Sequence, residues 1–132
     1  MAALASKRTE LRVLGTSVTL TEAVRKRAMS DLGLRIHFEV LDGFDAQRQA
    51  VIEQGSFDVY DQWFHSIDYL WPAGALQPIE LDRIEHWSEV NALPKTGRIA
   101  PDARYGQGCN PVTRLYVQPD GSVGDAPSAQ IS

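Results

Sequence analysis

The residues best suited to chemistry stand in two short segments, Gly15-Thr16-Ser17 and Asp61-Gln62-Trp63. The first segment offers backbone amides and two hydroxyl groups, which suit an anion where a helix begins, because the amino end of a helix carries about half a positive charge. The second brings together a carboxylate, an amide and an indole. That set suits a cationic or polar organic ligand through charge pairing and cation–π contact. We therefore expect a small-molecule site at these segments.

Each segment also has a plain structural interpretation. Gly15-Thr16-Ser17 could be an ordinary turn between a strand and a helix, with Thr19 capping the helix. Trp63 could fill a core, and Asp61 could cap a short helix that begins near Ser66. Both interpretations stay open on the sequence.

The other reactive side chains lack the partners that catalysis or metal binding requires. His65 and His86 have no base or acid positioned beside them, so we expect structural or surface roles. Cys109 is the only cysteine, which excludes an intramolecular disulfide, and it has no adjacent base to activate the thiol. The three histidines, which include His37, lack the ligand spacing of structural zinc. We expect no enzyme activity, no cofactor and no metal.

The charge balance argues against a nucleic-acid partner. The 132 residues carry 13 Lys and Arg against 17 Asp and Glu, a formal net charge of −4. The longest basic run, Arg25-Lys26-Arg27, would point in three directions on a helix and would not track phosphates. No apolar run approaches the roughly eighteen residues needed to cross a bilayer. Residues 1–9 lack the apolar middle of a signal peptide. The sequence neither shows nor excludes export.

The elements that must position the two segments are predicted from periodicity. Between Leu11 and Trp63 the pattern predicts strand, helix, strand, helix and strand. The strands are predicted at Leu11–Leu14, Arg35–Val40 and Phe57–Tyr60. Strands separated by helices of about ten to fifteen residues imply parallel pairing through right-handed crossovers. The carboxyl ends of parallel strands share one edge of a sheet, so both segments should lie there. The predicted fold class is α/β, with an open, mainly parallel sheet flanked by helices.

Capping signals define the predicted helices. Thr19 with Glu22 forms a capping box, so the first helix should begin near Leu20 and end at a left-handed Gly33. Asp45 is the predicted N-cap of the second helix. The apolar stripe expected to face the sheet comprises Leu20, Ala23, Val24, Ala28 and Leu32.

The second half of the chain gives weaker signals. We expect a short helix at residues 66–70, single helical turns at 81–84 and 87–90, and a strand at 113–117. The length suits one domain, to which we assign residues 1–117. Glycine and proline are frequent near the end of the chain, so we predict a loose tail at residues 118–132.

Three segments, Leu11–Thr16, Glu53–Tyr60 and Gly74–Ile79, follow one another in the order and spacing of extracellular solute-binding proteins. From about Leu11 to Val90 the chain resembles the polyamine-type branch of family 1 of these proteins. The resemblance implies the substrate-binding component of an ABC importer, with a type 2 periplasmic binding fold. It also implies a permease partner in the membrane and a periplasmic location.

The same resemblance implies which residues contact the ligand. They follow the first and third strands and are Gly15, Thr16, Ser17, Val18, Asp61, Gln62, Trp63 and His65. The solute expected from these side chains is small and polar or cationic. Members of the family close two lobes around the ligand, and the matching part corresponds to the amino-terminal part of the first lobe. We therefore expect a fragment that binds weakly alone and that forms a homodimer to cover the apolar surface of an incomplete lobe.

Two alternatives belong to other classes. The chain could be a small α/β enzyme that uses Asp61, His65 or Cys109. It could also be an interaction module that oligomerises through an exposed sheet edge and an aromatic surface around Trp63, Trp71 and Trp87.

Overall fold

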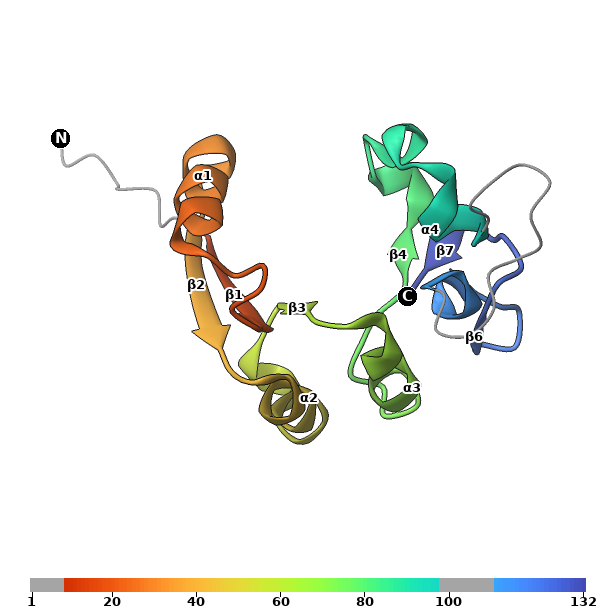
Figure 1. The fold of residues 1–132 in the computed structure, drawn as a ribbon, viewed down its shortest axis with the longest axis horizontal. Helices are drawn as coiled ribbons and strands as arrows, with labels where there is room; N and C mark the ends of the chain where they lie inside the picture. Colours follow the sequence, from red (N-terminus) through yellow and green to blue (C-terminus); the bar gives the residue numbers. More distant parts are fainter. Residues whose placement is uncertain (1–8, 98–110) are drawn as a thin grey trace, which may run out of the picture. The chain divides into compact units, whose positions relative to one another are not determined.

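The computed structural model of the protein describes residues 9–97 and 111–132 (Figure 1). The chain divides between Trp63 and Phe64 into two units, which we call the first and the second unit. This division differs from the predicted single domain at residues 1–117. The first unit contains the whole predicted alternation of strands and helices, and the second unit builds a separate sheet.

A parallel three-stranded sheet forms the centre of the first unit. Its strands are β1 (Glu10–Gly15), β2 (Arg35–Val40) and β3 (Val59–Asp61), and β1 lies between the other two (Figure 1). Both pairings are parallel. The predicted α/β class with a parallel sheet is confirmed.

Two helices cover the sheet of the first unit. The first, α1 (Glu22–Leu32), covers the face that carries Val13 and Ile36. The second, α2 (Gly43–Ile52), packs on β1 and buries Ala46 and Ala50 completely. Leu14 of β1 is also fully buried and points to the face opposite Val13, because side chains alternate along a strand.

The start of α1 differs from the predicted capping box. Its N-cap is Thr21, whose Oγ1 accepts a hydrogen bond from the Val24 N–H at 3.4 Å. The chain makes a turn between Thr16 and Leu20 before the helix begins, so Thr19 lies outside the helix. Glu22, the expected partner of Thr19, instead forms an ion pair with Arg25 at 2.6 Å. The predicted left-handed cap at Gly33 is confirmed, with φ 66°.

The side of α1 that faces the sheet also differs from the prediction. Leu20 and Ala28 of the predicted stripe pack in the core, as does Met29, whereas Ala23, Val24 and Leu32 are exposed, with Val24 at 53% and Leu32 at 63%. Val24 stands five positions before Met29, about 140° around the helix, so packing Met29 on the sheet turns Val24 toward solvent.

An ion pair holds β3 against β1. The register places Val13 opposite Val59, so Arg12 lies opposite Asp58, and the Arg12 guanidinium donates to Asp58 at 2.9 and 3.1 Å. The Arg12 backbone N–H donates to the same carboxylate at 2.8 Å, and the Asp58 N–H donates to the Arg12 carbonyl at 2.9 Å. The Arg12 side chain, through these hydrogen bonds, lowers the pKa of Asp58 from 3.8 to about 2.

The second unit consists of short elements. Its helices are α3 (Ile67–Leu70) and α4 (Ala92–Thr96), and its strands are β4 (Ile79–Glu80), β5 (Tyr116–Val117), β6 (Val123–Gly124) and β7 (Gln130–Ile131). Short 3-10 turns lie at Gln54–Ser56 in the first unit and, in the second, at Phe64–Ser66, Leu81–Arg83, Trp87–Glu89 and Pro111–Arg114. The predicted short helix and both single helical turns are therefore present. The predicted strand at 113–117 is reduced to β5.

The last residues of the chain form a central strand of the second sheet. The order is β4, β7, β5, β6, and β7 pairs antiparallel with both β4 and β5. The predicted loose tail is therefore wrong. The glycines and prolines form turns instead: Gly121, at φ 83°, donates its N–H to the Gln118 carbonyl at 2.9 Å and reverses the chain into β6.

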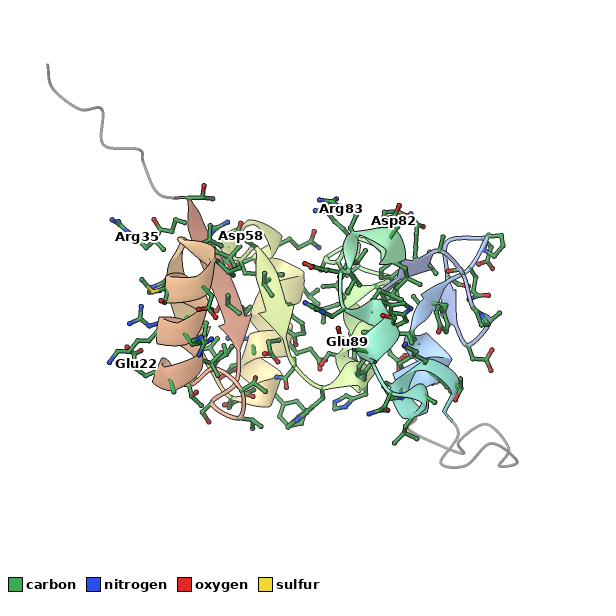
Figure 2. The ribbon with its side chains drawn as sticks, turned by 90° about the horizontal axis from the view of Figure 1, so that it is seen from above. Glu22, Arg35, Asp58, Asp82, Arg83 and Glu89 are labelled. Carbon is green, nitrogen blue, oxygen red and sulfur yellow. The ribbon has the colours of Figure 1, made fainter. Side chains whose placement is uncertain are left out.

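The core of the second unit gathers around β5. Val112, Leu115 and Tyr116 are buried, with Leu81, Trp87 and Ile131 packed against them. An ion pair between Arg114 and Asp68, with its two hydrogen bonds at 2.6 and 2.7 Å, joins the segment before β5 to α3. Figure 2 shows the side chains of both units.

Acid should remove the contribution of the Arg12–Asp58 pair. Because the pKa of Asp58 is lower in the folded chain than its ordinary 3.8, the pair stabilises the fold above about pH 4. This contribution is lost as the pH falls toward 2. Both side chains are more than a third exposed, so water screens the pair and the expected effect is small. Urea unfolding of Asp58→Asn should show a weaker acid dependence than the original chain.

The control for this prediction is Asp31→Asn, which removes the exposed pair with Arg27 inside α1. This variant should keep most of the acid dependence. If Asp58→Asn and the original chain lost the same amount of stability on acidification, the pair would have no role in the acid dependence.

Removing β7 should unfold the second sheet. Deletion of Gln130–Ser132 leaves β4 and β5 without the strand between them, so amide resonances of the second unit should collapse toward random-coil positions in NMR spectra. Ser132→Ala is the control, because it removes only the hydroxyl bond to the Arg114 carbonyl. A dispersed spectrum for the deletion variant would show that β7 is dispensable.

Candidate functional site

Three turns meet at the carboxyl edge of the sheet in the first unit. Gly15, at the end of β1, lies opposite Val40 of β2 and Asp61 of β3. The Leu41 N–H after β2 also donates to the Gly15 carbonyl at 2.9 Å. The turns after β1 and β3 are therefore neighbours, as the sequence predicts, and the turn after β2 joins them. We call these three turns, at residues 15–18, 42–44 and 61–63, the edge site.

The absence of a side chain at Gly15 lets β1 and β3 approach each other. A Cβ atom at this position would lie 2.3 Å from the Asp61 carbonyl oxygen and 3.0 Å from Leu20 Cδ1. The first contact is with the main chain, which cannot move aside as the end of a flexible side chain can. The glycine is therefore a requirement of the edge site.

The turn after β3 is fixed on the start of α2. Gln62 Nε2 donates to the Gly43 carbonyl at 3.1 Å, and Gln62 Oε1 accepts from the Trp63 N–H at 3.0 Å. A Cβ atom at Gly43 would lie 2.8 Å from the Trp63 ring, so the indole packs directly on the Gly43 main chain. Gln62 thus positions the turn, and the indole remains 50% exposed.

The turn after β1 has a buried part and an exposed part. Thr16 is 9% exposed, and its carbonyl accepts the Leu20 N–H at 3.2 Å. Ser17 and Val18 are exposed, with Val18 at 76%. Of the residues predicted here as ligand contacts, Ser17 and Val18 can be reached by a solute, whereas Gly15 and Thr16 shape the turn.

The charges at the edge site disfavour an anion. The Asp42 carboxylate already caps α2 and accepts the Phe44 and Asp45 N–H groups, both at 3.0 Å. The bond from the Asp45 backbone, followed by the bond from Phe44, holds the pKa of Asp42 below its ordinary value. Asp42 replaces the predicted N-cap Asp45, because it directly precedes the first helical residue. With Asp61 on the next turn, the carboxylates favour a cation.

The start of α1 also disfavours an anion. This helix begins at Glu22, so its amino end lies several residues beyond Gly15-Thr16-Ser17 and already carries an acidic side chain in its first turn. An anion at Gly15-Thr16-Ser17 would therefore not lie at the amino end of α1, which was the reason to expect one there.

Each turn of the edge site contributes one exposed apolar side chain. These are Val18, Phe44 and Trp63, at 76%, 77% and 50% exposure. Two aromatic rings and carboxylates at the same edge form a set that can hold an organic cation through cation–π contact and charge.

The remaining predicted residues lie elsewhere. His65 belongs to the second unit, where it adds to the effect of Arg114 in lowering the pKa of Asp68. His86 contacts the Glu89 carboxylate through Nδ1 at 2.8 Å, on an exposed 3-10 turn. Cys109 lies outside the described residues. Residues 9–97 and 111–132 contain no group of three or more side chains that could hold a metal ion.

The sequence prediction missed the turn after β2. No ligand contact was predicted at Asp42-Gly43, although a parallel β2 must end at the same edge as β1. The signal that could have found it is Asp-Gly followed by the aromatic Phe44 at the end of a strand.

Comparisons with family models, with curated proteins and with solved structures gave no match to this chain. The resemblance to solute-binding proteins therefore remains a prediction from the sequence. Within the described ranges, no helix is both long and apolar enough to cross a membrane.

Replacing Gly15 should destabilise the first unit. In Gly15→Ala the added methyl group meets the Asp61 carbonyl, and overpacking of this kind costs about 1–3 kcal/mol. Gly55→Ala is the matched control, because a Cβ atom there has no neighbour within 4 Å and the effect should stay within about 0.5 kcal/mol. Denaturant unfolding measures both variants. Equal stability of the two would mean that the strands do not approach as described.

Proposed function

We propose that this chain captures a small polar or cationic organic solute at the edge site, as the substrate-binding part of an ABC importer. The observation that carries the proposal is the convergence of three strand ends at one edge of a parallel sheet. Open α/β sheets bind ligands at this edge. The importer, its membrane permease and a periplasmic location follow from the sequence resemblance.

The side chains of the edge site define the class of solute. The half-exposed face of Trp63 and the exposed ring of Phe44 can stack on an organic cation. Asp61 supplies a carboxylate two positions before Trp63, and Ser17 adds a hydroxyl on the turn after β1. A compact solute with an ammonium group and some apolar surface fits this combination.

Binding by the edge site should be weak. The site is an exposed rim, so the solute keeps part of its water shell and few contacts are fully desolvated. We expect dissociation constants of about 1 mM, which corresponds to a binding free energy of roughly −4 kcal/mol.

NMR titration of the isotope-labelled chain tests the proposal. The probes are tetramethylammonium, a linear alkyl diammonium and, as an uncharged comparison, a monosaccharide. Saturable shifts should concentrate on Ser17, Val18, Phe44 and the Trp63 indole for the cations. Trp63→Ala should reduce the shift changes strongly, whereas Trp87→Ala, in the second unit, should leave those of the first unit unchanged. Shifts spread over other surfaces, or no response to any probe, would contradict solute capture at this edge.

A further inference from the structure

The outer edge of β2 is open in the described part of the chain. β2 pairs with β1 alone, and Figure 1 shows it on the side of β1 away from β3. The N–H groups of Arg35 and Leu41 point to β1, where they donate to the Thr9 and Gly15 carbonyls at 2.9 Å. Because the direction alternates along a strand, the main-chain groups of Ile36 and Phe38 point outward. The Ile36 carbonyl accepts Arg25 Nη1 at 3.3 Å and keeps a second lone pair.

The charges at the two ends of this strand form no ion pair with other described residues. Arg35 and Glu39 share one face of β2, and neither forms an ion pair within residues 9–97 and 111–132. By contrast, Arg12, Arg25 and Arg27 of the same unit are all paired. Figure 2 shows Arg35 extending away from β1.

The spacing of these charges is self-complementary. When two copies of β2 pair antiparallel about a two-fold axis through His37, residues whose numbers add to 74 lie opposite each other. Arg35 then faces Glu39 of the second copy, and the symmetry repeats the pair. Ile36 faces Phe38 on the other side of the sheet, and these two residues carry the outward main-chain groups that exchange hydrogen bonds.

Apolar surface on α1 lies next to this edge. Leu32 is 63% exposed and stands seven positions after Arg25, so both lie on one side of the helix. Arg25 marks that side as the one above the β2 edge, because its guanidinium reaches the Ile36 carbonyl. A second copy at the edge would bring its own α1 to the same face and cover Leu32.

We propose that two copies of this chain pair through β2, in the register that places Arg35 against Glu39, and form one continuous sheet across a two-fold axis. The occupant of the edge is a second copy, because antiparallel pairing of β2 with itself sets opposite charges against each other and apolar residues against each other. This dimer is independent of the solute proposed above, which binds at the carboxyl ends of the strands.

Charge reversal tests the register. Arg35→Glu alone places Glu against Glu39, and Glu39→Arg alone places Arg against Arg35, so each variant should bind itself at least about tenfold more weakly than the original chain. A mixture of the two variants restores both opposite-charge pairs and should form a heterodimer. Arg83→Glu, an exposed charge reversal in the second unit, is the control and should dimerise as the original chain does.

Sedimentation velocity over a concentration series measures these outcomes. The original chain should approach twice the 14.6 kDa mass of one chain, each single variant should sediment as a monomer, and the mixture should return to the dimer. A monomeric original chain at every concentration would overturn the proposal. So would single variants that still dimerise, or a mixture that stays monomeric.

Discussion

The close approach of two main chains at Gly15 is the constraint on which the first unit depends. A side chain there would meet the Asp61 carbonyl at 2.3 Å, so β3 can lie beside β1 only because residue 15 is glycine. The Arg12–Asp58 pair fixes the same two strands near their amino ends. Register is thus set at both ends of a strand as short as β3, and this register brings Asp61, Gln62 and Trp63 to the edge of the sheet.

Several polar side chains of the edge site hold its turns in place and are not available as reactive groups. Gln62 uses its amide to join its turn to Gly43, and Asp42 uses its carboxylate to cap α2. The groups that the proposed solute would contact are the faces of Trp63 and Phe44, the Asp61 carboxylate and the Ser17 hydroxyl. These groups can make the non-covalent contacts on which the proposed solute capture rests.

Local patterns predicted the order and type of the elements in the first unit, because alternation in β2 and the glycine cap of α1 depend on neighbouring residues alone. The N-caps were predicted wrongly because two residues of a type that is preferred at the N-cap stand near the start of each helix. These are Thr19 and Thr21 before α1, and Asp42 and Asp45 around the start of α2. The choice depends on where the chain leaves the preceding strand. β7 was missed for a related reason: two residues carry no periodic signal, and Gln130 is held by Glu80, fifty positions earlier in the chain.

The turns after β2 and β3 meet at the edge that Gly15 creates, and nuclear Overhauser spectroscopy of the chain in solution can detect this contact. Strong cross-peaks are expected between the outer ring protons of Trp63 and the α-protons of Gly43, together with upfield shifts of these α-protons from the indole ring current. Gly43 α-protons at ordinary shifts, without any contact to Trp63, would show that the two turns do not meet.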